Sequence, residues 1–126
     1  MLPFDTRIVA GRPASEQVVA AVHRAVATGR LNPGDEFPSV RKLSAEVGIN
    51  PNTAHKIVAA LVADGVLEVH PGLGTRVAAP KAAPASRRAK EMTPPAAELA
   101  LLAKRLGASR EELEELVRRE WDKLEA

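Results

Sequence analysis

A short turn between two helical patterns restricts the fold of this chain more than any other sequence feature. Ser39 precedes the first pattern as an N-cap, and apolar residues at helical spacing follow it. Gly48 ends that helix, because glycine tolerates the positive φ of a left-handed turn. Asn50 and Pro51 then begin the next helix as its N-cap and its first helical residue. The sequence therefore predicts two helices joined by a tight turn.

The segments on either side of this turn complete a small domain. An amphipathic pattern between Ser15 and Thr28 predicts an earlier helix, with Ser15 as its N-cap and Gly29 as its end. After the two central helices, alternating residues flank the glycine-rich turn 71–74, which predicts a β-hairpin. The predicted fold class is therefore mainly α with a small β-hairpin, a winged helix-turn-helix followed by a two-helix tail.

The predicted organisation has four parts, of which two contain regular structure. They are an N-terminal arm at 1–12, a winged helix-turn-helix domain at 13–79, a linker at 80–95 and a tail at 96–126. Within the domain, the helix-turn-helix covers 39–58 and the wing covers 66–78. The arm shows no periodicity, and the linker is rich in Ala, Pro, Lys and Arg without an apolar period. Both are therefore expected to be irregular chain.

Two amphipathic helices are predicted in the tail, separated by Gly107 and with Ser109 as the N-cap of the second. Helices this short are marginal alone, so their apolar stripes need a partner. They either fold back on the chain's own domain or pair with a second copy. We favour pairing, because an antiparallel exchange buries both stripes. The residues predicted to form this dimer interface are Leu99, Leu102, Leu106, Leu113, Leu116, Val117, Trp121 and Leu124.

Composition excludes most classes of enzyme. Hydrophobic residues make up 45% of the 126 residues but aromatic ones only 2%, so the small core must be aliphatic. The chain has no cysteine and no tyrosine, and its three histidines are scattered, which leaves no thiolate nucleophile, disulfide or metal site. It also has no cofactor loop and no apolar run long enough to span a membrane. We therefore expect a cytoplasmic protein that is not an enzyme and uses no cofactor or metal.

The charge distribution favours an anionic partner for the first part of the chain. Residues 1–90 carry 12 Lys and Arg against 7 Asp and Glu, whereas residues 91–126 carry 6 against 9. Every side chain expected to be exposed in the first turn of the second central helix is a hydrogen-bond donor, an acceptor or a cation. An asparagine there can pair with adenine in a major groove, so double-stranded DNA is the expected partner. These outer residues are Asn52, Thr53, His55 and Lys56.

Several of these residues have a second interpretation. Asn50 either serves as a helix cap alone or also contacts DNA, because capping does not exclude a DNA contact. His55 is either a solvated surface residue or a ligand of a phosphate or base edge. The basic residues of the linker are either solvated or add phosphate contacts, which would make binding more dependent on salt. They are Arg87, Arg88 and Lys90.

Four segments of the sequence resemble the GntR family of bacterial transcription regulators. They are Gly29-Arg-Leu-Asn-Pro-Gly-Asp-Glu-Phe-Pro-Ser-Val-Arg-Lys-Leu43, Gly48-Ile-Asn-Pro-Asn-Thr-Ala54, Asp64-Gly-Val-Leu67 and Pro71-Gly-Leu-Gly-Thr-Arg-Val77. Their order and spacing match the family over about residues 13–78. The short tail and Asn50-Pro51-Asn52-Thr53 resemble the YtrA-like branch. That resemblance implies a tail that serves dimerisation and neighbouring genes that often encode ABC transporters.

The family match implies DNA contacts at particular positions. They are Ser39 and Arg41 from the second helix, Asn50, Asn52, Thr53, His55 and Lys56 from the recognition helix, and Gly72 and Arg76 from the wing. The chain departs from the pattern in two places. Val40 stands where many members have glutamate, and Pro51 stands where some have a basic residue. One DNA contact made by those members is therefore expected to be absent from this chain, and its base preference should differ from theirs.

Together these features predict a sequence-specific DNA-binding transcription regulator. It would be a homodimeric repressor on an inverted-repeat operator, in control of transporter genes, with an unknown small-molecule effector as a further partner. The alternative is a winged-helix protein-interaction module that does not bind DNA. That alternative predicts that Arg41, Asn52 and Lys56 can be replaced without effect.

Overall fold

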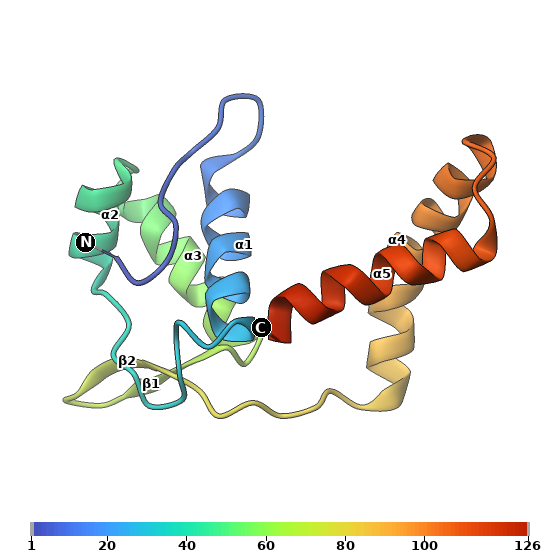
Figure 1. Ribbon diagram of the computed structural model, residues 1–126. Helices are drawn as coiled ribbons and strands as arrows, with labels where there is room; N and C mark the ends of the chain where they lie inside the picture. The colour runs from blue at the N-terminus through green and yellow to red at the C-terminus, as the bar shows by residue number, and fades with distance from the viewer. Residues whose placement is uncertain (1, 126) are drawn as a thin grey trace. The chain divides into compact units, whose positions relative to one another are not determined.

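The computed structural model describes residues 2–125, and the chain divides into two compact units, Met1–Pro80 and Lys81–Ala126. The first unit contains α1 (Ala14–Ala27), α2 (Val40–Val47), α3 (Pro51–Ala63), β1 (Leu67–His70) and β2 (Gly74–Val77), as Figure 1 shows. The second contains α4 (Ala85–Arg105) and α5 (Arg110–Glu125). The predicted fold class, a mainly α winged helix-turn-helix with a small hairpin and a two-helix tail, is confirmed.

The turn between α2 and α3 forms as its sequence predicts. The Ser39 side chain caps α2 by accepting from the Lys42 N–H at 3.1 Å, and Gly48 ends that helix at φ 78°. The Ser44 hydroxyl donates to the Ile49 carbonyl at 2.6 Å and so anchors the turn to α2. The Asn50 side chain then caps α3. Local hydrogen bonds therefore fix the angle between the two helices.

The positive φ of Gly48 makes this turn sensitive to a side chain. We expect Gly48→Ala to lower the free energy of unfolding by about 1–2 kcal/mol, because a Cβ disfavours the left-handed region. Space is not the cause, since no heavy atom lies within 4 Å of the added Cβ. Gly48→Asn is the matched control and should lose less than Gly48→Ala, because asparagine tolerates this region. Urea unfolding measures both, and equal stability of all three proteins would contradict the left-handed turn.

The wing is a braced hairpin. β1 pairs with β2 in antiparallel register from Leu67 opposite Val77 to His70 opposite Gly74. A third stretch of backbone lines the other side of β2, where the Phe37 N–H donates to the Thr75 carbonyl at 2.9 Å. The Gly34 N–H likewise donates to the Val77 carbonyl at 2.9 Å. The segment before α2 therefore holds the wing in place.

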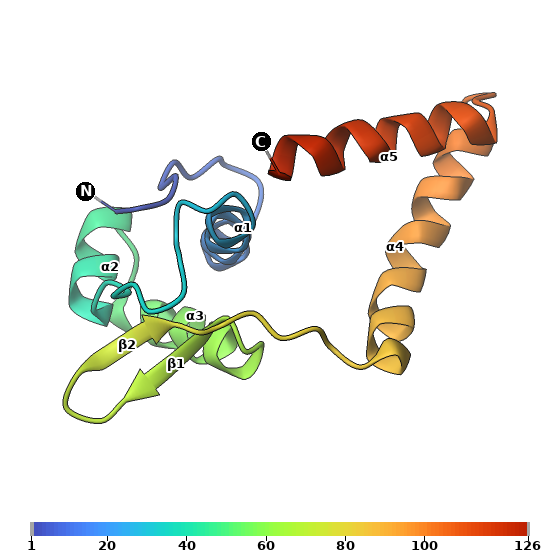
Figure 2. The same cartoon turned by 60° about the horizontal axis from the view of Figure 1, so that its bottom comes forward.

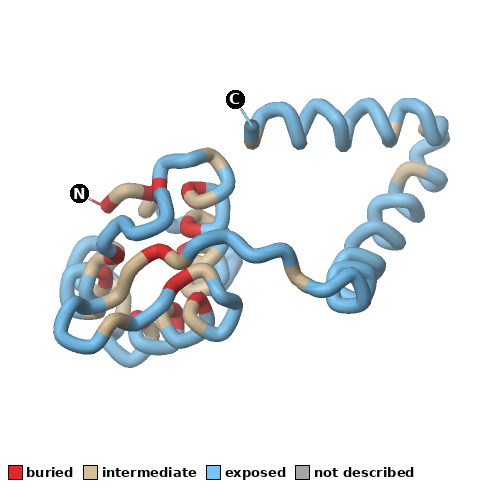
Figure 3. The backbone as a smooth tube through the Cα atoms, turned by 90° about the horizontal axis from the view of Figure 1, so that it is seen from below, coloured by how far each residue is buried: buried red, intermediate tan, exposed pale blue. Residues whose placement is uncertain are grey.

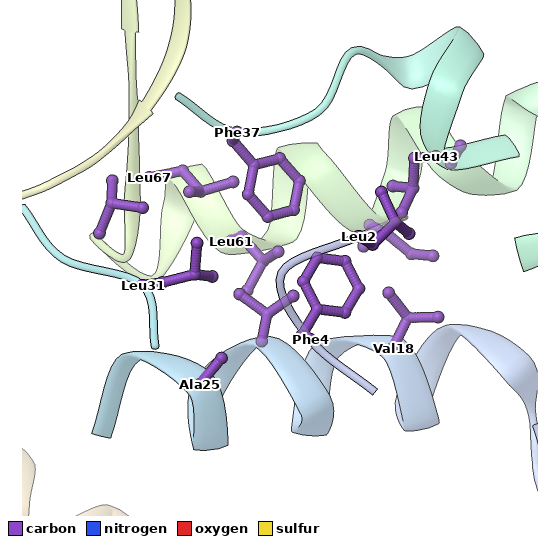
Figure 4. Close-up of a cluster of buried hydrophobic side chains, with 13 residues drawn as sticks. Leu2, Phe4, Val18, Ala25, Leu31, Phe37, Leu43, Leu61 and Leu67 are labelled. Atoms are coloured by element: carbon purple, nitrogen blue, oxygen red, sulfur yellow. The ribbon is translucent and has the colours of Figure 1, made fainter. Parts of the chain in front are cut away.

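The core of the first unit is mostly aliphatic and involves every one of its helices. Figure 3 shows the buried positions gathered in this unit, and Figure 4 shows the side chains converging between α1 and α3. The buried residues are Leu2, Phe4, Val18, Val22, Ala25, Leu31, Phe37, Leu43, Ala54, Ile57, Leu61, Leu67 and Val77. The aromatic-poor composition thus still supplies one contiguous core.

The N-terminal segment corrects one prediction. Residues 1–12 were expected to be an extended arm outside the domain, but Leu2 and Phe4 are buried in the core. The ring of Phe4 stacks on that of Phe37, with centroids 5.8 Å apart (Figure 4). Gln17 also holds the segment, because its side-chain amide exchanges hydrogen bonds with the backbone of Val9 at 2.7 and 2.8 Å. The segment is therefore part of the folded domain.

Two local features accompany this segment. Hydrogen bonds from the Arg7 side chain and, to a lesser degree, from its backbone N–H hold the pKa of the Asp5 carboxyl below its usual value. The predicted N-cap of α1 is wrong, because Pro13 occupies that position and Ser15 lies inside the helix. The fixed φ of proline suits a helix start without a side-chain cap.

The second unit is two helices that contact each other and bury no residue. The Ser109 hydroxyl accepts from the Glu112 N–H at 3.1 Å, which confirms the predicted cap of α5. The linker prediction for 80–95 is wrong over most of its length, because α4 begins at Ala85. Pro94 and Pro95 lie inside that helix, where they remove two N–H donors. These prolines are the reason why the sequence predicts the start of this helix only at residue 96.

Candidate nucleic-acid interface

The first turn of α3 separates apolar from polar side chains. Ala54 and Ile57 point into the core and are buried. Asn52, His55 and Lys56 are exposed, and Thr53 is half-buried. The helical period places these polar residues on the face opposite the core. The structure thus brings four of the predicted contact residues together at one helix end.

The cap of α3 limits what its backbone can bind. The Asn50 side chain accepts from the Asn52 N–H at 2.8 Å, and Pro51 has no N–H to donate. Two of the amides that a helix N-terminus offers to an anion are therefore occupied or missing. Side chains must then carry most of the recognition from this end of α3.

α2 adds exposed polar and cationic groups beside this turn. Ser39 and Arg41 are exposed, and so is Lys42. The Ser39 oxygen accepts a hydrogen bond within the helix cap, and its hydroxyl proton stays available to a partner. Within residues 2–125, no ion pair involves Arg41, Lys42 or Lys56. These three cations are therefore available to an anionic partner.

The wing places its two predicted contact residues differently. Gly72 lies exposed at the tip. Arg76 is turned inward, because its guanidinium donates to the Gly34 carbonyl at 3.2 Å and to Glu36 Oε1 at 3.3 Å. Only 26% of its side chain is exposed. Arg76 therefore helps to hold the wing in place. This role depends on the pairing of residues 34–37 with β2, a contact between distant parts of the chain that the sequence position of Arg76 does not reveal.

Lys56 also borders a hollow of about 410 Å³ between α1 and α3. Its floor is apolar and includes Val19, Ala20 and Ile57. Among the described residues, no helix is long and apolar enough to cross a membrane. Because the floor of this hollow is apolar, a charged partner is expected instead at the polar face of α3 and the cations of α2.

A family comparison decides the class of protein. The family model described as "Bacterial regulatory proteins, gntR family" matches residues 14–77. The chain belongs to the GntR family. That family consists of regulatory proteins, and the relatives that the chain matches are named as transcription regulators. The match covers α1, the helix-turn-helix and the wing, and therefore every predicted DNA contact.

Individual relatives agree with the YtrA-like branch of the GntR family. The chain is 34% identical over 77 residues to the "HTH-type transcriptional repressor YtrA" of Bacillus subtilis (strain 168). That alignment covers 61% of this chain and 58% of the relative, less than two thirds of its length. The predicted resemblance to this branch is confirmed.

Two solved structures extend the comparison. A "Transcriptional Antiterminator from Listeria monocytogenes EGD-e" is similar with a TM-score of 0.83 and 27% identity, covering 95% of this chain and 92% of that one. The AraR DNA-binding domain in complex with its operator ORX1 is similar with a TM-score of 0.50 and 28% identity, covering 53% and 81%. The first likeness spans both units, whereas the second covers about half of this GntR-family chain.

Proposed function

We propose that this chain is a homodimeric, sequence-specific DNA-binding repressor that acts on an inverted-repeat operator. The observation that carries the proposal is the exposed polar first turn of α3, flanked by the unpaired cations of α2. An α-helix fits the major groove, where its first turn reads base edges. Asn52 has the amide that pairs with adenine, and Arg41 has a guanidinium suited to phosphate or guanine.

The second unit supports the homodimer. All eight predicted interface residues lie exposed or half-buried in a single chain. Two helices that bury no residue are not stable by themselves in water. A second copy supplies the same stripes in reverse order, as a two-fold axis requires. Two domains related by that axis would place their recognition helices on inverted half-sites.

Separate observations support the remaining parts of the proposal. Repression is supported by the relative whose name includes it. Control of transporter genes is supported by the resemblance to the YtrA-like branch. The hollow beside Lys56 is where a small-molecule effector would act, because its volume suits a small ligand and it adjoins the proposed DNA surface.

Selection of bound sequences from a random double-stranded DNA library tests directly whether the chain binds DNA in a sequence-specific way. We expect one enriched inverted repeat. In mobility shifts on that site, Asn52→Ala should bind about 10–100-fold more weakly and lose preference at one position per half-site. Arg41→Ala should weaken binding to all sequences and lower the salt slope by about one if it contacts a phosphate.

Arg24→Ala is the matched control for the cation. Arg24 is exposed in the last turn of α1, away from the recognition turn, and its loss should leave affinity unchanged. An unenriched library, or equal binding by Asn52→Ala, Arg41→Ala and wild type, would favour the protein-interaction module. In that case a pull-down with the same variants should recover one partner equally well.

A further inference from the structure

The hollow between α1 and α3 is lined by both helices of a packed pair. These two helices are neighbours within the first unit (Figures 1 and 2). The volume of about 410 Å³ is within the usual range for small-molecule sites. The lining residues recur at helical spacing, so each helix contributes one face. They include Glu16, Val19 and Ala20 on α1, and Lys56, Ile57 and Ala60 on α3.

Small side chains leave this hollow open. Ala20 on α1 and Ala60 on α3 both line it, and each has a single methyl group where a longer side chain would fill the space. Ile57 closes the floor and is only 1% exposed, because it belongs to the core. Val19 is half-buried and packs against the same core. The hollow therefore has a fixed apolar floor before any ligand binds.

The two charged side chains at the hollow have opposite signs and are unpaired. Glu16 is exposed on α1, and Lys56 is exposed on α3. Within the described part of the chain, residues 2–125, they form no ion pair with each other or with another residue. A carboxylate accepts from an ammonium group, and the Lys56 ammonium donates to a carboxylate. A ligand that has both charges would therefore satisfy both side chains at once.

We propose that this hollow binds a small zwitterion with an apolar body, whose ammonium group pairs with Glu16 and whose carboxylate pairs with Lys56. Free apolar amino acids and short apolar peptides share this chemistry. The apolar body would cover Val19 and Ile57 and remove their apolar surface from water. An anion without an ammonium group would be repelled by the Glu16 carboxylate. An uncharged ligand would leave both side chains without a partner.

A ligand at this site would oppose DNA binding. This consequence rests on the proposed function above, in which Lys56 belongs to the DNA surface. When the Lys56 ammonium holds the ligand's carboxylate, it is no longer available to a phosphate. By linkage, the ligand lowers the affinity for the operator by the same factor as the operator lowers the affinity for the ligand. The ligand therefore acts as an inducer that releases the operator.

Calorimetric titration of the full chain without DNA tests the site itself. The probes are L-leucine and L-leucyl-L-leucine, and the one that binds more tightly shows whether an amino acid or a peptide is preferred. N-acetylation of that probe, or amidation of its carboxylate, should weaken binding by about tenfold or more, because each change removes one charged contact. Replacement of its leucine by glycine should do the same, because the apolar body is lost.

Substitutions locate the bound probe. Ala60→Leu should lose detectable binding, because the longer side chain fills the hollow. Ala59→Leu is the matched control and should bind normally, since Ala59 is exposed on the same helix outside the hollow. Glu16→Gln should weaken binding about tenfold. Its control is Glu111→Gln, which removes a carboxylate from the first turn of α5 and should change nothing.

Mobility shifts on the selected operator test the link to DNA. A saturating probe should weaken binding of the wild type about 5–150-fold, the usual range for coupled sites, and should leave Ala60→Leu unaffected. The site is overturned if neither probe binds the wild type, or if a folded Ala60→Leu, checked by circular dichroism, binds as tightly. A probe that binds without weakening operator binding contradicts the inducer role. If the wild type binds the probe but selects no operator, the proposed function fails and the site stands.

Discussion

Charged residues in place of Leu106 and Trp121 should separate the homodimer into single chains. We expect the double variant Leu106→Asp/Trp121→Asp to sediment as a monomer and to bind a two-half-site operator about 10²–10⁴-fold more weakly. Both side chains are exposed in a single chain, Leu106 to 72%, so the substitutions remove no buried contact and only the hydrogen bond from Trp121 Nε1 to Glu125 within the unit. The loss arises because two linked domains bind the second half-site as an intramolecular event.

Leu101→Asp is a close control for this variant. Leu101 is 71% exposed, as Leu106 is, but it lies outside the predicted stripe at 99, 102 and 106. It should leave the dimer intact. Binding to a single isolated half-site should be the same in all three proteins, because the first unit is unchanged. A dimer that survives the double substitution, or one that Leu101→Asp breaks equally, would show that the stripe is not the interface.

Features encoded by neighbouring residues could be predicted from the sequence. Ser39, Gly48 and Asn50 each act on backbone groups within a few residues, so the caps and the turn follow from residue type and spacing alone. The polar face of α3 follows from the helical period in the same way. For this reason the helix-turn-helix and the exposure of Asn52 and Lys56 agree with the prediction.

Features that depend on distant contacts could not be predicted. Phe4 follows no periodic pattern, and its partner Phe37 lies in a different segment of the chain. The family match implies a DNA contact at Arg76, but its hydrogen bond to Glu36, 40 residues away in the sequence, could not be predicted from its position. The start of α4 was misplaced because the tandem prolines Pro94 and Pro95 are unfavourable within a helix, yet the helix continues through them.

The buried N-terminal segment leads to the second large effect. Phe4→Ala should lower the free energy of unfolding of the first unit by about 3–5 kcal/mol, the usual loss for a buried aromatic ring. Phe4 is only 3% exposed and stacks on Phe37. Phe37 is also bonded to β2 and lies two residues before the cap of α2. When Phe37 loses its contact with the Phe4 ring, both the wing and the start of α2 should therefore become less stable.

Urea unfolding of Phe4→Ala, Phe37→Ala and the double variant measures this coupling. Because the two rings contact each other, the double variant should lose less stability than the sum of the two single losses. Val9→Ala is the control, since its side chain is exposed on the same segment and its removal should change stability by no more than about 0.5 kcal/mol. If Phe4→Ala also changes stability this little, residues 1–12 are a peripheral arm, and the support of α2 must come from α1 and α3 alone.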